Sequence, residues 1–228
     1  MTRTYKDIRY TLTRSRRKTA SIYIERDGEV TVLVPNDLSD ADVEKVLEGK
    51  RKWIYQHLAE WHDLNATQVH RQYVNGEGFL YLGRSYRLKL VREQSEPLML
   101  KDGYFCLLSV NGLAAEAAFK TFYRAKGEVR IPERVAYYQR KMGVEASAVK
   151  VLDLKHHWAS CTPGGRLNFH WKCMMAPATV LDYIVVHELA HLRYPNHTAA
   201  FWNEVDKVMP DYRDRKEWLR VNGAGMGV

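Results

Sequence analysis

Two histidines four residues apart, His187 and His191, enclose the segment His-Glu-Leu-Ala-His. In a helix, side chains at this spacing project from one face, one turn apart. Two neutral imidazoles placed in this way can bind one metal ion. Glu188 lies beside the ligand face and can reach a water molecule on that ion, which is the arrangement of zinc hydrolases. The short motif also occurs by chance in unrelated proteins, so further residues must support a hydrolytic metal site.

A third histidine, His197, follows six residues after the motif. The intervening segment Tyr194–Asn196 contains a proline, which ends a helix because it lacks an N–H donor and restricts the residue before it. The chain can turn there and return His197 to the metal. Asn196 is the expected N-cap of a second helix over Thr198–Val205. Three protein ligands with a fourth position left for water are typical of a catalytic site.

The residues before the motif indicate that its helix is buried. They form an apolar run: Val180, Leu181, Ile184, Val185 and Val186. Two histidines and a glutamate on a buried helix cost free energy unless they have a partner. We expect that partner to be one zinc ion per chain.

Hydrophobic periodicity predicts an α+β protein with a β-rich N-terminal part, about residues 1–110, and a helical metal-site part, about residues 111–228. Apolar alternation bounded by turn residues predicts strands at 10–13, 21–25, 30–34, 78–83, 86–91 and 104–108. Ser39 is the expected N-cap of a helix that ends near Asp63.

The metal-site part has a helical pattern from about residue 113 to 142, which Pro132 is expected to kink or divide into two helices. Two further strands, at 149–154 and 167–171, flank a Pro-Gly-Gly turn that predicts a hairpin. Pro177 is expected to open the motif helix.

Length and composition limit the classes of protein to consider. A chain of 228 residues can form one domain or two small ones. No apolar run approaches the roughly 18 residues of a membrane span, and the charged N-terminus lacks the apolar stretch of a secretion signal. The three cysteines have no CxxC spacing, which argues against a disulfide framework and favours a reducing cytoplasm.

The net charge of +8 is spread along the chain. A solvated basic surface explains it, and a basic groove for a phosphate-rich or acidic substrate is the alternative. Nucleic acid is a possible partner but not the favoured one.

Other segments accompany the motif: Trp158–Cys161, Leu167–Trp171, Phe201–Trp202, Met209–Leu219, and, near the start, Arg16–Ile22 and Val34–Pro35. Together with the histidines they resemble the YgjP-like (DUF45) metallopeptidase family over roughly residues 12–222. The resemblance implies a compact zincin-like fold related to the SprT-like proteases, one zinc ion and hydrolase chemistry. Members are usually catalogued as metallopeptidases, and some bacterial ones carry a UTP pyrophosphatase name.

Two residues depart from the family pattern, which usually shows an arginine followed by Trp-Gly-Ser-Cys. Ala159 replaces the glycine, and His157 stands where the arginine is expected. Alanine keeps the local conformation only if its φ is negative. Histidine is a weak and pH-dependent substitute for an arginine that donates two hydrogen bonds to a phosphate, so this departure weakens the nucleotide interpretation.

Four residues are candidates for contact with the substrate. His157, like its neighbour His156, could bind substrate or an oxyanion, or could be an ordinary hydrogen-bonded turn residue. Tyr212 could donate to a developing oxyanion, with packing of the last helix as the alternative. Arg213 and Arg215 could form a phosphate clamp, as could the basic residues 16–18.

These observations predict a cytoplasmic zinc hydrolase with His187, His191 and His197 as ligands. Glu188 is its general base and takes a proton from water that zinc acidifies. Peptide hydrolysis is favoured, because the sequence has no carboxylate cluster for the Mg²⁺ ions that usually bridge phosphates. Nucleoside triphosphate (UTP) pyrophosphatase activity, favoured by the basic charge, remains the alternative. A non-catalytic metal or nucleic-acid binding module would not need Glu188.

Overall fold

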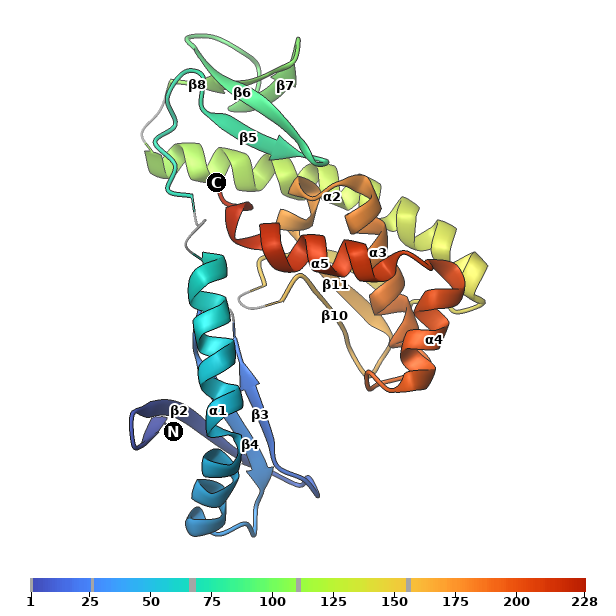
Figure 1. Ribbon diagram of the computed structural model, residues 1–228. Helices are drawn as coiled ribbons and strands as arrows, with labels where there is room; N and C mark the ends of the chain where they lie inside the picture. The colour runs from blue at the N-terminus through green and yellow to red at the C-terminus, as the bar shows by residue number, and fades with distance from the viewer. Residues whose placement is uncertain (1, 26, 66–68, 110–111, 155–156) are drawn as a thin grey trace. The chain divides into compact units, whose positions relative to one another are not determined.

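The computed structural model describes residues 2–25, 27–65, 69–109, 112–154 and 157–228. The chain forms two compact units, Met1–Thr67 and Gln68–Val228, each with its own hydrophobic core (Figure 1). The composition change expected near residue 111 falls inside the second unit. The β-rich part of the sequence is therefore divided between the two units.

The first unit is a four-stranded sheet packed on one helix. Its strands are β1 (Thr2–Tyr5), β2 (Ile8–Ser15), β3 (Ser21–Ile24) and β4 (Val30–Pro35), in the order β1-β2-β4-β3. The central pair β2–β4 is parallel and the outer pairs are antiparallel. Burial alternates along β2 and β4, so that one face of the sheet is buried, as period-two patterning requires.

Helix α1 (Asp40–Asn65) covers that face with Val43, Leu47 and Ile54, which are fully buried. Ser39 caps the helix as predicted, because its Oγ accepts a hydrogen bond from the Asp42 N–H at 3.2 Å.

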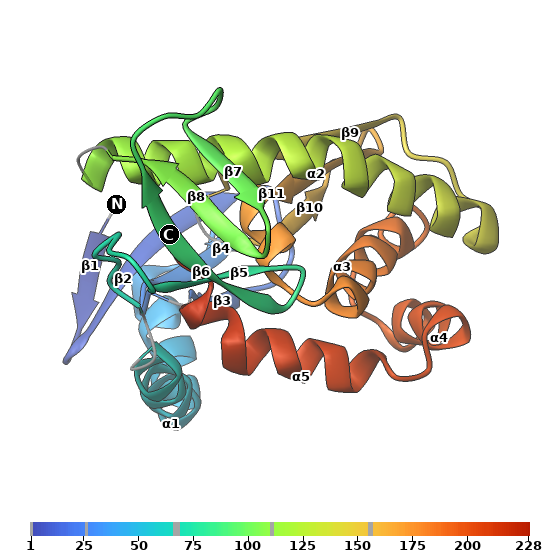
Figure 2. The ribbon, with the colours of Figure 1, turned by 90° about the horizontal axis from the view of Figure 1, so that it is seen from above.

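The second unit begins with a four-stranded sheet that packs on a long helix. Its strands are β5 (Gly78–Tyr81), β6 (Arg84–Val91), β7 (Leu98–Lys101) and β8 (Tyr104–Leu108), in the order β5-β6-β8-β7. Strand β7 was not expected from the sequence. Helix α2 (Gly112–Met142) lies between this sheet and the C-terminal helices (Figures 1 and 2).

Helix α2 is continuous over 31 residues, so Pro132 does not divide it. The helix loses one hydrogen bond at the proline, but Ile131 and Val135 on either side are buried in the core. Packing of this face outweighs the local cost.

The turn between β5 and β6 joins the sheet to the site region. Leu82 N–H and Gly83 N–H donate to the Met174 and Met175 carbonyls, at 2.8 and 3.0 Å. Gly83 has a φ of +79°, and a Cβ there would lie 2.8 Å from the Pro177 Cα. Only glycine satisfies both the conformation and the close approach.

A second, three-stranded sheet has the order β10-β11-β9, with β9 (Ala148–Leu152), β10 (Ala159–Cys161) and β11 (Arg166–His170). The two predicted strands, now β9 and β11, are parallel neighbours and do not form a hairpin. The Pro-Gly-Gly turn instead joins β11 to the short strand β10, which the sequence did not indicate. Gly165 at this turn has a φ of +75°.

The remaining elements are the 3₁₀ helix η1 (Trp171–Met175), helices α3 (Ala178–Ala190), α4 (Ala199–Val208) and α5 (Tyr212–Asn222), and the short helix η2 (Gly223–Gly225). Helix α3 contacts α2, α4, α5 and β10. Within the described residues, no helix is both long and apolar enough to cross a membrane. The mixed α+β architecture is thus confirmed.

Candidate metal centre

Helix α3 carries the motif into the core of the second unit. Its apolar residues from Val180 to Ala190 are almost completely buried, as the sequence predicts. Glu188 is also buried, whereas His187 is partly exposed. His191 is the residue at which the helix ends, and it keeps helical dihedral angles (φ −66°, ψ −18°). The two histidines therefore project from one face of the chain, one turn apart.

The chain turns back after His191. Leu192 and Arg193 N–H groups donate to the Leu189 and Ala190 carbonyls, which closes the last turn of the helix. Helix α4 begins later than expected: Thr198 is its N-cap, and its Oγ1 accepts from the Phe201 N–H at 3.4 Å. The prediction that Asn196 caps this helix is wrong. His197 consequently lies outside the helix.

The three histidines converge. One nitrogen from each of His187, His191 and His197 lies within 4.8 Å of the other two. The Nε2 atoms of His187 and His197 are 2.9 Å apart. His191 Nδ1 lies 3.0 Å from the Tyr194 carbonyl oxygen, to which it donates, so its Nε2 keeps a free lone pair. This donor set could hold a metal ion.

Burial keeps two of these imidazoles neutral. Burial, together with the nearby His191, His197 and Lys216, lowers the pKa of His187 to about 3. Burial also lowers the pKa of His197, and His191 and Lys216 add to this effect. A neutral imidazole has the lone pair that a metal ion needs.

Glu188 is the charged group next to the triad. One of its carboxylate oxygens, Oε2, is buried without a hydrogen-bond partner among the described residues. Burial raises its pKa to about 8. Burial, and then the Glu188 charge, raises the pKa of the Cys161 thiol on β10 and of the Tyr183 hydroxyl on α3. Helix α3, which carries this carboxylate, contacts β10.

Two aromatic residues at the start of α4 pack against the histidines. Phe201 is fully buried, and its ring centroid lies 4.6 to 4.9 Å from those of the three imidazoles. Trp202 stacks on His197 with centroids 5.6 Å apart and planes at 22°. Both residues therefore hold the imidazole rings in place by packing against them.

The other candidate residues lie around this core. Tyr212 is buried and stacks on the far side of Trp202, with centroids 5.2 Å apart. Its ring therefore packs helix α5 against helix α4. Lys216, one turn further along α5, places its ammonium 4.6 Å from the Trp202 ring centroid.

The two candidate arginines make contacts away from the histidines. Arg215 donates to Asp211 at 2.7 and 2.9 Å and to the Thr179 carbonyl at 3.1 Å, which ties α5 to the start of α3. Arg213 is exposed, lies over the Tyr212 ring and is 3.8 Å from Asp206. Neither contact set includes a residue of the triad.

The departures from the expected pattern lie just before and at the start of β10. His157 is exposed, and His156 lies outside the described residues. Ala159 does not have a positive φ, so the alanine fits the strand without strain. Residues 16–18 belong to the first unit.

Two partly buried ion pairs that the sequence did not indicate position α3 and α4. Arg134 on α2 donates two hydrogen bonds to Asp182 on α3, at 2.6 and 2.9 Å. Arg193 donates to Glu204 on α4 at 2.6 Å and to the Gly143 carbonyl at 2.9 Å. The second pair spans the turn between His191 and His197.

The family model described as YgjP-like, metallopeptidase domain, matches residues 18–222. The chain belongs to this family. The match spans both units and confirms the family resemblance. The YgjP-like family is one of metallopeptidases, and the triad that could hold a metal ion agrees with a metal-dependent peptidase.

Comparison with curated proteins gives no match. Among solved structures, the chain is similar to the metallopeptidase zymogen of Pyrococcus abyssi abylysin. The identity is 25%, the alignment covers 41% of this chain and 92% of that chain, and the TM-score is 0.37.

Proposed function

We propose that the protein is a zinc-dependent peptidase, with His187, His191 and His197 as zinc ligands and Glu188 as general base. The observation that carries this proposal is the convergence of three imidazole nitrogens within 4.8 Å beside a buried carboxylate. Membership of a metallopeptidase family supports it.

The donor set suits zinc. Tetrahedral coordination at about 2.0–2.1 Å places ligand nitrogens about 3.3–3.4 Å apart. The 2.9 Å between His187 and His197 needs only a small outward movement of His197, which is exposed. When bound, zinc would supply a Lewis acid that lowers the pKa of a water molecule and polarises a carbonyl group.

Glu188 is suited to accept a proton. Its unpartnered Oε2 can accept a hydrogen bond from water, and its raised pKa makes it a stronger base than an exposed glutamate. A cation at the histidines would favour its ionised form. The same carboxyl can then return the proton to the leaving amine.

Strand β10 supports a peptide substrate. It is the outer strand of its sheet, paired with β11 on one side and with no described strand on the other. An extended peptide can add to such an edge through main-chain hydrogen bonds. Because β10 contacts helix α3, which carries Glu188, a peptide bound at this edge would lie beside the helix of the general base.

The nucleotide alternative needs a phosphate clamp at the metal. Arg213 and Arg215, which could supply one, are occupied by Asp206, Asp211 and the Thr179 carbonyl. Lys216 is the basic group whose charge reaches His187 and His197. A single lysine is a smaller anion site than the clamp that a triphosphate uses.

The test compares two substrate classes on the zinc-loaded protein: an unfolded polypeptide and a nucleotide panel that includes UTP. We expect polypeptide cleavage that a chelator abolishes and zinc restores. Glu188→Gln should bind zinc as the unmodified protein does but turn over about 10²–10⁴-fold more slowly. Glu217→Gln, an exposed change on α5, is the matched control and should keep full activity.

Other results would overturn the proposal in different ways. Zinc-dependent release of pyrophosphate from UTP, lost in Glu188→Gln and without polypeptide cleavage, would assign the site to nucleotides. Tight zinc binding with neither activity would favour a non-catalytic metal module.

A further inference from the structure

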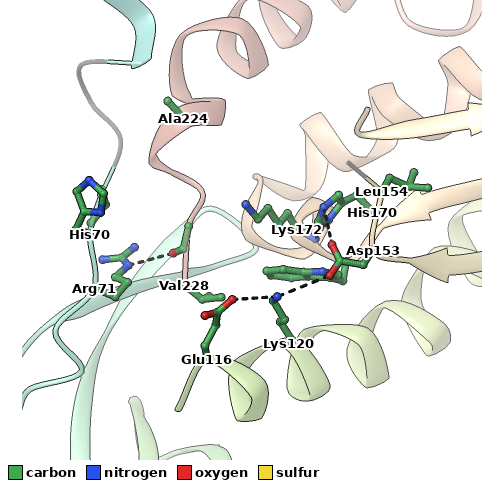
Figure 3. A pocket seen from close by; sticks show the side chains of 13 residues that line it. His70, Arg71, Glu116, Lys120, Asp153, Leu154, His170, Lys172, Ala224 and Val228 are labelled. Atoms are coloured by element: carbon green, nitrogen blue, oxygen red, sulfur yellow. Dashed lines mark hydrogen bonds and ion pairs between the residues drawn. The ribbon is translucent and has the colours of Figure 1, made fainter. Parts of the chain in front are cut away.

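The second unit contains a pocket of about 390 Å³ that shares no residue with the histidine triad or Glu188. Five segments line it: residues 69–71, helix α2, residues 153–154 after β9, residues 170–172 at the start of η1, and the C-terminal residues 224–228 (Figure 3). This volume is in the range of small-molecule sites.

The acidic groups of the pocket are already paired. Lys120 Nζ lies 2.9 Å from Glu116 Oε1 and 3.7 Å from Asp153 Oδ2 (Figure 3). His170 Nδ1 accepts from the Lys172 N–H at 3.0 Å, so the proton of the neutral ring is on Nε2, which lies 3.4 Å from Asp153 Oδ1. The carboxylates are therefore not free to receive a cationic ligand.

Lys172 is the cation that remains. Among the described residues its ammonium forms no ion pair or hydrogen bond, and it lies 5.6 Å from the Trp171 ring centroid. Figure 3 shows the Lys172 side chain directed away from Asp153 and toward the segment of Ala224 and Val228. Burial lowers its pKa, which is the cost of leaving a cation without a partner.

A second donor in the wall also lacks a partner. Trp171 Nε1 is buried and has no hydrogen-bond partner within the described part of the chain. Buried indole N–H groups usually have one. The unsatisfied groups of the pocket wall are thus the Lys172 ammonium, which favours an anion, and an indole N–H that is closed to solvent.

The arrangement of these donors suits a tetrahedral anion better than a planar one. Arginine recognises carboxylates with a planar fork, but Arg71 donates to the Gly227 and Gly78 carbonyls, at 3.0 and 2.8 Å. The free ammonium, that of Lys172, acts as a point charge and imposes no planar geometry on its ligand. We propose that this pocket binds a phosphate group, either free or carried by a small molecule.

The test measures anion binding to the full chain after a chelator has removed metal, so that anions cannot bind at the histidines through an ion. The probes are inorganic phosphate, glycerol 3-phosphate and succinate, by calorimetry and by the shift in unfolding temperature. We expect both phosphates to bind and to raise the unfolding temperature, and succinate to bind at least about tenfold more weakly. Tighter binding of glycerol 3-phosphate identifies a phosphorylated molecule as the ligand, and tighter binding of inorganic phosphate identifies the ion. Both results support a phosphate site.

Two variants make the assignment specific. Lys172→Met should weaken phosphate binding roughly 10–100-fold, the effect of losing a hydrogen bond to a charged group. Without phosphate it should unfold at the same or a higher temperature, because an unpaired, partly buried cation is removed. Lys89→Met, which removes an exposed lysine of β6, should bind phosphate as the unmodified chain does.

The indole N–H signal of Trp171 in nuclear magnetic resonance spectra, assigned with Trp171→Phe, should shift on addition of phosphate. Absence of phosphate binding at millimolar concentration, equal binding of succinate, or undiminished binding by Lys172→Met would each overturn the proposal.

Discussion

At the scale of single residues, His197 differs from the other two histidines. His187 and His191 are fixed by helix α3, whereas His197 lies before α4 and is exposed. Its ring is held by Trp202, which is itself backed by Tyr212. Metal affinity should therefore depend on this aromatic stack as well as on the ligand itself.

Replacing His197 with alanine should lower zinc affinity by at least about 100-fold, because one of three protein ligands is lost. Trp202→Leu should lower it less, about 10–100-fold, the range for residues that orient ligands. Competition with a chromogenic chelator measures both. His157→Ala, a histidine outside the triad, is the control, and unchanged affinity in His197→Ala would remove this residue from the site.

The sequence predicted the triad because its spacing is local. His187, Glu188 and His191 lie within one helical turn, and a proline accounts for the return of His197. Tyr183 lies four residues before His187 on the same face of α3, and its ring contacts that of His187. The sequence did not single out this contact, although residues at this spacing on a helix are neighbours. The pocket around Lys172 draws on five distant segments, and no local pattern brings these together.

At the scale of elements, the turn from α3 to α4 sets the position of the third histidine. Arg193 in this turn pairs with Glu204, which is buried on α4. It also donates to the carbonyl of Gly143, the residue that follows α2. A buried carboxylate that loses its partner is costly. The ion pair should therefore hold the turn in the conformation that aligns His197.

Arg193→Met should weaken zinc binding and lower the free energy of unfolding by about 1–3 kcal/mol, although Arg193 touches no ligand. The double variant Arg193→Met with Glu204→Gln should recover part of both losses, because it removes the buried carboxylate, which in Arg193→Met keeps only the longer contact of 3.5 Å with Lys207. A double-mutant cycle by urea unfolding and zinc titration tests this coupling. Additive effects would mean that the pair does not hold the turn.

Elements with strong periodicity were predicted, and their pairing was not. Strands β2, β3 and β4 and helices α1 and α3 follow from alternation, caps and apolar runs, whereas β1 was not predicted. The parallel pairing of β9 with β11 depends on contacts between residues about 18 apart, and β10 is too short for a clear pattern. Local sequence also misleads at Pro132, because the packing of α2 overrides a residue that usually breaks a helix.

At the scale of the whole molecule, His170 should contribute to acid sensitivity. Burial and the Lys172 and Lys120 charges, opposed by Asp153, together lower its pKa to about 4. The ring is neutral in both folded and unfolded chains above about pH 6.5. Between about pH 6.5 and 4 the unfolded chain takes up the proton first, so stability falls as the pH falls through this window.

His170→Gln should therefore show a shallower loss of stability over that window than the unmodified chain. Urea midpoints of the metal-free proteins at several pH values between 7.5 and 4 measure it. The comparison between variant and unmodified chain removes the contribution of the triad, which is common to both. Identical pH dependence of the two proteins would show that His170 does not contribute.

Metal should stabilise the two units unequally. All of the proposed ligands belong to Gln68–Val228, and the first unit has a separate core in which Leu47 and Ile54 of α1 pack against the sheet. A ligand that binds only the folded state stabilises it by about 2.7 kcal/mol at a free concentration 100 times its Kd. This stabilisation should reach the unit that contains the ligands and leave the other unchanged.

Hydrogen exchange followed by mass spectrometry resolves the two units in the intact chain. Addition of zinc should slow exchange in the peptides of α3 and α4, and a chelator should reverse the effect. Exchange in α1 and in β2 and β4 should stay the same in both conditions, because the linkage acts only through a unit that binds the ion. Equal slowing in α1 would show that the two units unfold as one cooperative body. Unchanged exchange in the peptides of both units would show that zinc does not stabilise the fold.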